Sequence, residues 1–160
     1  MGWPNIAIVS GGFDPIHIGH IRLLKEASRY GTELWVIVNN DNWLMAKKGF
    51  IFMPEQERVE ILKHIKHVTT VILTDHPKSP TDMSISSTLT KLASFYTNLE
   101  YSLRFCNGGD RKEGCIPTAE EEICKKFGVE MIYSVGGEKI QSSTELARKA
   151  GNTRTILEAK

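Results

Sequence analysis

The chain has 160 residues, with 41% hydrophobic and 24% charged side chains and a formal net charge of +1. This length and composition are ordinary for one globular domain that can bury a substantial core. A net charge this close to zero gives no basic excess for binding nucleic acid or an anionic membrane, so we expect neither as a partner.

Cysteine usage and the N-terminus favour a cytoplasmic protein. Cys106, Cys115 and Cys124 are odd in number and include no Cys-x-x-Cys pair. We therefore expect free thiols, and neither a disulfide framework nor a metal ion bound by the protein itself. Residues 1–5 contain no basic leader, and no later stretch is long and apolar enough for a membrane span.

The first predicted elements are a buried strand and a sharp turn. Residues 6–9 read IAIV, an apolar run that is typical of a buried parallel strand. Gly11 and Gly12 follow directly. Because glycine has no side chain, the backbone there can turn tightly and approach a ligand closely.

Two histidines lie where this turn leads into a helix. His17 and His20 are spaced His-x-Gly-His, and residues 21–30 read as a helix that Gly31 ends. The free N–H groups and the positive end of the dipole at a helix start favour a bound phosphate. Gly19 would let that phosphate lie against the backbone between the two rings.

The remaining elements alternate along the chain. Further strands are predicted over 34–38, 68–73, 101–106 and 129–134. Helices are predicted from Pro54, from Asp82 or Ser84 to about residue 96, from Pro117 or Thr118 to Phe127, and from Ser142 until Gly151 and Asn152 interrupt it. Residues 39–42 read as a turn, 43–52 as a loop, and His64, His67 and His76 as surface residues.

This alternation indicates an α/β fold. We expect a single Rossmann-like domain over residues 1–160, with a five-stranded, mainly parallel sheet, right-handed crossovers and helices on both faces. In such sheets, ligands bind beyond the carboxyl ends of the strands, where the winding changes direction.

The segment 6–20 resembles the nucleotidyltransferase superfamily, whose members carry a His-x-Gly-His motif after the first strand. Those enzymes join an NTP to a phosphorylated partner and release pyrophosphate. Three further segments are similar to the glycerol-3-phosphate cytidylyltransferase and heptose-phosphate adenylyltransferase branches. They are lysines before a Glu-Gln-Glu-Arg helix at 47–58, Gly-Gly-Asp at 108–110, and Ser-Ser-Thr at 142–144.

Each of these three segments also has a plain structural interpretation. The lysines could be solvated, Gly-Gly-Asp is a common turn sequence, and Ser142 with Glu145 fits a helix capping box. Residues 85–88 match the serine motif as well, but they precede the fourth predicted strand. We therefore interpret them as the start of an ordinary helix.

The resemblance implies a role for each matching residue. His17 and His20 would be catalytic and would donate hydrogen bonds to phosphate oxygens. Lys47 or Lys48, with the Mg²⁺ that accompanies the NTP, would balance the charge of the leaving pyrophosphate. The nucleotide would contact Gly11, Gly12, Phe13, Gly19, Gly109, Asp110, Arg111, Ser142, Ser143 and Thr144. The acceptor would contact Asp14, Asp41 and Arg58, although Asp14 could instead cap its own turn.

The implied activity is transfer of a nucleotidyl group from CTP or ATP to a sugar or polyol phosphate, by a homo-oligomer that is most simply a dimer. A non-catalytic nucleotide-binding module is one alternative, and it would bind NTP without releasing pyrophosphate. A phosphopantetheine or nicotinamide mononucleotide adenylyltransferase is another. That branch would carry an arginine where this chain has Ala147, whereas Arg148 matches the cytidylyltransferase-like position.

Overall fold

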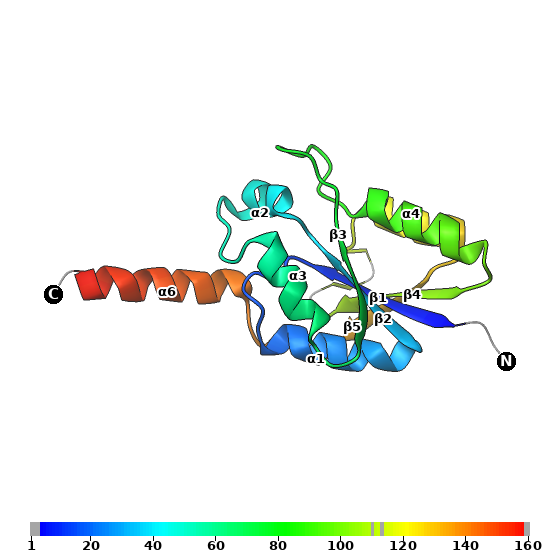
Figure 1. Ribbon diagram of the computed structural model, residues 1–160, viewed down its shortest axis with the longest axis horizontal. Helices are drawn as coiled ribbons and strands as arrows, with labels where there is room; N and C mark the ends of the chain where they lie inside the picture. Colours follow the sequence, from blue (N-terminus) through cyan, green and yellow to red (C-terminus); the bar gives the residue numbers. More distant parts are fainter. Residues whose placement is uncertain (1–3, 110, 113, 159–160) are drawn as a thin grey trace.

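The computed structural model describes residues 4–109, 111–112 and 114–158, in which strands and helices alternate (Figure 1). The strands are β1 (Asn5–Gly11), β2 (Glu33–Val38), β3 (Val68–Leu73), β4 (Ser102–Gly108) and β5 (Glu130–Val135). The helices are α1 (Ile18–Ala27), the short 3-10 helix η1 (Ser28–Tyr30), α2 (Asp41–Lys48), α3 (Glu55–Lys63), α4 (Ser86–Thr97), α5 (Thr118–Phe127) and α6 (Ser143–Glu158).

The strands form one parallel sheet in the order β3-β2-β1-β4-β5. In the centre of the sheet, Ile8 of β1 is paired with Trp35 of β2 on one side and Phe105 of β4 on the other. The order therefore changes direction between β1 and β4, and the carboxyl ends of these two strands border the switch point. The predicted Rossmann-like α/β fold is confirmed.

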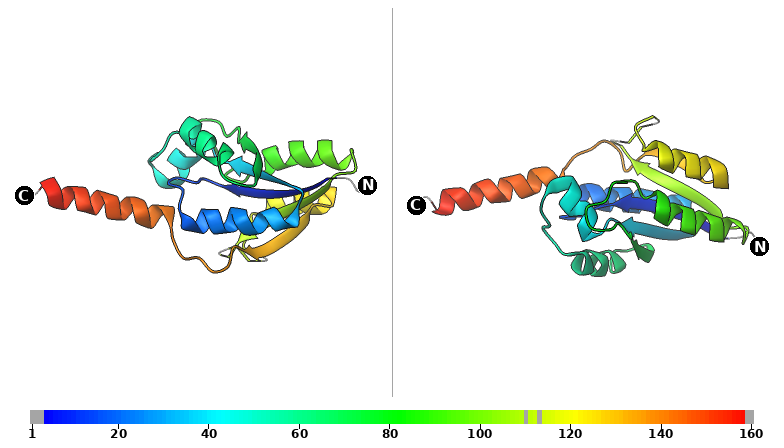
Figure 2. Two further views of the ribbon diagram at one scale, coloured as in Figure 1. Left: turned by 60° about the horizontal axis from the view of Figure 1, so that its bottom comes forward. Right: turned by 90° about the horizontal axis from the view of Figure 1, so that it is seen from above.

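Helices cover both faces of the sheet, as predicted (Figure 2). Ile6 and Ile8 of β1 pack in a core with α4 and α5, whereas Ala7 and Val9 pack in a second core with α1 and α3. Successive side chains of a strand point to opposite faces, so a strand buried on both sides reads as a continuous apolar run. Such apolar runs are the reason that the strands could be predicted from the sequence.

The prediction of a loop over 43–52 was wrong for residues 43–48, because α2 occupies residues 41–48, and only residues 49–52 of that range lie outside a helix. The Asn40 side chain accepts a hydrogen bond from the Trp43 N–H and so caps the start of α2. Gly49, with φ of 78°, ends the helix in the left-handed conformation. The asparagine-rich segment that was read as a turn is therefore a helix start.

The start of α4 also differs from prediction, since its N-cap is Ile85 and not Asp82 or Ser84, although the Ser84 hydroxyl accepts a hydrogen bond from the Ser86 N–H (3.3 Å). The N–H of Ile85, the residue before α4, donates to a carboxylate oxygen of Glu120 in α5 (3.0 Å). Residues 86–88 do begin this helix, as the sequence predicted.

The structure corrects the interpretation of His76 as a surface residue, because His76 is buried. Its Nδ1 lies 2.8 Å from the Thr74 hydroxyl and its Nε2 lies 2.9 Å from the Ser84 carbonyl. A carbonyl can only accept, so Nε2 donates and the ring ties the end of β3 to the segment before α4.

The last helix is longer than predicted, because α6 continues through Gly151 and Asn152 to Glu158. It projects away from the sheet (Figures 1 and 2). Within the described part of the chain, no helix is both long and apolar enough to cross a membrane.

Candidate active site

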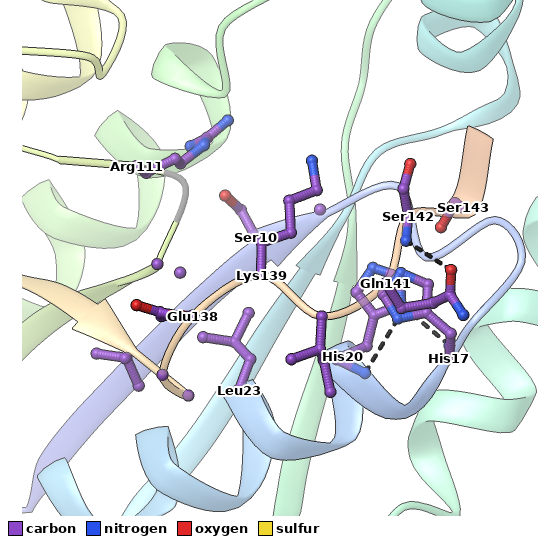
Figure 3. Close-up of a pocket in the computed structure, with 18 residues that line it drawn as sticks. Ser10, His17, His20, Leu23, Arg111, Glu138, Lys139, Gln141, Ser142 and Ser143 are labelled. Atoms are coloured by element: carbon purple, nitrogen blue, oxygen red, sulfur yellow. Dashed lines mark hydrogen bonds between the residues drawn. The ribbon is translucent and has the colours of Figure 1, made fainter. Parts of the chain in front are cut away.

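A cavity of about 270 Å³ opens at the switch point of the sheet (Figure 3). The ends of β1, β4 and β5 border it, and the first turns of α1 and the connection from β5 to α6 complete its wall. The residues that line it are Ser10, Gly11, His17, Gly19, His20, Leu23, Gly108, Gly109, Arg111 and residues 135–143.

The two histidines form the start of α1. His17 is the N-cap, and its Nδ1 accepts a hydrogen bond from the Gly19 N–H (3.0 Å). The His17 N–H in turn donates to Nδ1 of His20 (3.2 Å), and the two rings stack with centroids 3.8 Å apart. The His-x-Gly-His spacing thus builds a reciprocal capping box out of two imidazoles.

These backbone contacts fix which nitrogen carries the proton in each ring. A backbone N–H can only donate, so both Nδ1 atoms accept and the proton of each neutral ring lies on Nε2. Burial, followed by the neighbouring His17 and the charge of Lys48, lowers the pKa of His20 to about 3. Burial also lowers the pKa of His17, followed by the charges of Lys139 and Lys48. At pH 7 the site therefore holds two neutral rings with Nε2–H donors.

Gly19 and Gly109 are two of the glycines in this wall that leave room for a neighbouring group. A side chain at Gly19 would bring its Cβ within 2.9 Å of the His17 ring. Gly19 therefore makes room for the imidazole that caps α1, a reason different from the predicted phosphate approach. A Cβ at Gly109 would collide with the carbonyl oxygen of Gly137. The ends of β4 and β5 can approach each other this closely only because residue 109 is glycine.

The serine segment reaches the cavity at the start of α6. Ser142 Oγ accepts a hydrogen bond from the Glu145 N–H (3.4 Å), and the Ser143 hydroxyl donates to the Pro15 carbonyl (2.8 Å). Thr144 is exposed and is not among the lining residues. The Glu145 carboxylate pairs with Arg148 (2.7 Å), so only the serine half of the predicted capping box is formed.

Asp14 is buried behind the histidine segment and does not line the cavity. Its Oδ2 accepts from the Phe52 N–H (2.8 Å) and its Oδ1 accepts from the Met53 N–H (2.6 Å). Lys48 donates from Nζ to the Asp14 carbonyl (3.1 Å), and burial lowers the pKa of this lysine. Asp14 and Lys48 thus fasten the segment between α2 and α3 to the turn after β1.

Arg58 is the largest fully buried side chain, and its guanidinium joins three parts of the chain. It donates to the carbonyls of Met53 (2.9 Å), Gly12 (2.8 Å) and Asn39 (2.6 Å). It also forms an ion pair with the Asp41 carboxylate (2.7 Å). Arg58 and Asp41 are thereby committed to each other and to the backbone behind the cavity.

The structure therefore brings together only part of the predicted site. The predicted residues that line the cavity are Gly11, His17, Gly19, His20, Gly109, Arg111, Ser142 and Ser143. Those outside the lining are Gly12, Phe13, Asp14, Asp41, Lys47, Lys48, Arg58 and Thr144, although the Phe13 ring packs 4.9 Å from the His20 ring. Asp110 lies outside the described residues.

Lys139 lines the cavity and was not predicted as a site residue. It lies in the connection from β5 to α6, and its charge is one cause of the lowered pKa of His17. The available signal was Gly136-Gly137, which marks the carboxyl end of another parallel strand and hence of the ligand-binding edge.

The described residues provide no group of three or more His, Cys, Asp or Glu side chains that could hold a metal ion. The acidic side chains next to the histidines fit such an ion poorly. Asp14 uses both oxygens for backbone N–H groups, and Asp41 pairs with Arg58. A Mg²⁺ ion at this site would therefore be held by the phosphates of a nucleotide.

Comparison with known proteins gives a consistent family. Residues 8–149 match the family model described as cytidylyltransferase-like. Over 67 residues the chain is 42% identical to an FAD synthase of Pyrococcus horikoshii, and this aligned segment covers 41% of this chain and 45% of that enzyme. Over 73 residues it is 37% identical to the bifunctional protein HldE of Koribacter versatilis, and this aligned segment covers 44% of this chain and 15% of HldE.

The chain thus matches less than half the length of these curated relatives. A solved structure covers more of it. The lipopolysaccharide core biosynthesis protein from Thermoplasma volcanium superposes with a TM-score of 0.61 at 26% identity, over 85% of this chain and 99% of that one.

Proposed function

Because the chain belongs to the cytidylyltransferase-like family of nucleotidyltransferases, we propose that it transfers a nucleotidyl group from an NTP to a phosphorylated small molecule and releases pyrophosphate. The observation that carries this proposal is the stacked pair of neutral histidines. His17 and His20 present two Nε2–H donors at a helix N-terminus, inside the cavity at the switch point. Such a site accommodates phosphate groups.

The proposed reaction is one in-line displacement. A phosphate oxygen of the acceptor forms a bond to the α-phosphorus of the NTP, while the bond from that phosphorus to the bridging oxygen of the β-phosphate breaks. The pyrophosphate leaves with the electron pair of the broken bond, and the NTP enters as its magnesium complex. The chemistry needs no covalent enzyme intermediate, so the protein contributes positioning and charge stabilisation.

The two histidines and Lys139 inside the cavity, and Lys48 outside its lining, each have a defined part in this reaction. The Nε2–H groups of His17 and His20 donate to the α- and β-phosphate oxygens, where negative charge grows in the transition state. Lys139 adds a positive charge near the leaving pyrophosphate. Lys48 lies behind the turn after β1 and is suited to the phosphate of the acceptor, whereas Lys47 is exposed.

The relatives favour ATP as the NTP. FAD contains an adenosine monophosphate half, so the enzymes named FAD synthase suggest ATP as donor and FMN as acceptor. The similarity to HldE and to a lipopolysaccharide core biosynthesis protein favours a sugar phosphate as the second candidate acceptor.

The experiment that tests this function is pyrophosphate release from each of the four NTPs with a panel of acceptors. The panel contains FMN, glycerol 3-phosphate and hexose and heptose phosphates. Release that requires both substrates supports the proposal. NTP binding without pyrophosphate release for every acceptor in the panel would instead identify a non-catalytic nucleotide-binding module.

Ser142→Ala is expected to raise the KM for the NTP by about tenfold or more, the loss typical of a hydrogen bond to a charged group. Because Ser142 Oγ already accepts from a backbone N–H, its own proton is available to a phosphate oxygen. Thr144→Val is the matched control, since Thr144 is exposed and outside the cavity.

Steady-state kinetics with a fixed acceptor concentration measures both variants, and circular dichroism verifies that each is folded. If Thr144→Val raised the KM for the NTP and Ser142→Ala left it unchanged, the hydroxyl of Thr144 would bind the nucleotide in place of that of Ser142.

A further inference from the structure

Glu120, the third residue of α5, is a carboxylate in the protein interior with 2% of its surface exposed. Its Oε1 accepts the N–H of Ile85 (3.0 Å) and thereby caps α4 from a neighbouring helix. Its Oε2 is buried and has no hydrogen-bond partner among the residues that the structure describes. The contact with α4 uses only Oε1 of Glu120. It does not explain why Oε2 is buried as well.

The second oxygen faces Arg111. Glu120 Oε2 lies 3.6 Å from a terminal nitrogen of the Arg111 guanidinium. Burial raises the pKa of Glu120, and the positive charge of Arg111 opposes that shift. Taking a lone carboxylate out of water is unfavourable. We therefore interpret the approach of Arg111 to the buried Glu120 carboxylate as a specific electrostatic contact.

Arg111 connects this carboxylate to the cavity. Its backbone N–H donates to the carbonyl of Gly108 (2.9 Å), the last residue of β4, and Arg111 is one of the residues that line the cavity. Figure 3 shows Arg111 at the end of the cavity away from His17 and His20. An arginine side chain that no neighbour held would sample many rotamers, and binding would have to order it.

The nucleoside would occupy the Arg111 end of the cavity. If the triphosphate lies against the histidines and the start of α6, the base and ribose extend along the glycine-lined edge at Gly108, Gly109 and Gly136. No side chain projects from this edge at these three positions, so a flat group can lie against it. A planar guanidinium at that end can donate to acceptor atoms of the base or ribose, or can stack on the base.

We propose that Glu120 is a positioning residue that holds the Arg111 guanidinium against the nucleoside part of the bound NTP. The inference rests on the proposed function, because it assumes an NTP with its triphosphate at the histidine pair. It adds a buried residue of α5 to the proposed nucleotide site. The Gly-Gly-Asp motif had indicated only the segment at the end of β4.

The test is an equilibrium binding comparison by calorimetry, with each of the four NTPs and with inorganic tripolyphosphate as probes. Arg111→Met is expected to weaken binding of the preferred NTP about tenfold, the scale of one or two lost hydrogen bonds, and to leave tripolyphosphate binding unchanged. Glu120→Gln keeps an oxygen for the Ile85 N–H but removes the charge beside Arg111. We expect it to weaken NTP binding about fivefold, a part of the Arg111 loss.

The double variant separates positioning from independent effects. If Glu120 acts through Arg111, Glu120→Gln adds no further loss in the Arg111→Met background. Glu122→Gln is the matched control, since Glu122 is exposed on the same helix. Thermal melting of every variant records any change in stability separately from binding.

Several results would overturn the proposal. Glu120→Gln would strengthen anion binding if Glu120 acted only through its electric field, and it would leave NTP binding unchanged if Glu120 only capped α4. Additive losses in the double variant, or an equal loss for tripolyphosphate after Arg111→Met, would also contradict it. Wild-type NTP binding without pyrophosphate release would refute the proposed function but leave these binding comparisons valid.

Discussion

His20→Asn is expected to lower turnover by about a hundredfold or more, the usual loss when one donor to a transition-state oxygen is removed. The asparagine oxygen can replace Nδ1 of His20 as the acceptor for the His17 N–H, so the start of α1 is retained. What disappears is the Nε2–H that lies inside the cavity. The substitution therefore separates the capping role of the ring from its proposed catalytic role.

His20→Gln is the matched variant, because the longer amide places an N–H close to the former Nε2. We expect His20→Gln to retain more turnover than His20→Asn when both are measured by pyrophosphate release at saturating substrates. If a folded His20→Asn protein kept wild-type turnover, the imidazole would be a helix cap and no more.

Arg58→Met is expected to destabilise the protein by about 3–5 kcal/mol, the range for breaking one partner out of a buried ion pair. The guanidinium is fully buried and is hydrogen-bonded to three backbone carbonyls as well as to Asp41. Removing it leaves those acceptors unsatisfied. Arg58→Lys should not restore stability, because a single ammonium group cannot reach partners on three sides.

Urea unfolding measures the free energy of each variant. Lys91→Met is the control, since Lys91 also pairs with an aspartate but its side chain is 69% exposed. An exposed ion pair of that kind contributes about 0–1 kcal/mol. Equal losses for Arg58→Met and Lys91→Met would contradict the scaffold role of Arg58.

The strands were predictable from the sequence because each buried strand is a short apolar run between polar or glycine-rich segments. The α2 helix was not predicted, since only Leu44 of its residues is buried and no apolar stripe marks it. Its two caps, Asn40 and Gly49, were visible, but the same residue types also form turns. The end of the last helix was predicted too early at Gly151, because glycine lowers the stability of a helix but need not end it.

The site was predictable only where a local motif encodes it. His17, His20 and the serine segment are recognisable from their spacing and position. The partners of Arg58 and Asp14 lie as far as 46 and 39 residues away in the chain, so no local pattern reveals them. Glu120 reads from the sequence as an ordinary acidic residue in the first turn of a helix, and only the packing of α5 against α4 shows that it is buried beside Arg111.

The protonation of the histidine pair tests the central claim most directly. Proton–nitrogen NMR of the imidazole side chains reports which ring nitrogen carries a proton, and His17→Asn and His20→Asn assign the signals. We predict that both rings are neutral with the proton on Nε2 at pH 7, and that His20 stays neutral at pH 5, because burial lowers its pKa to about 3. Both Nε2–H signals should shift when the magnesium complex of the NTP is added. An imidazolium ring, a proton on Nδ1, or signals that do not respond to nucleotide would contradict the account.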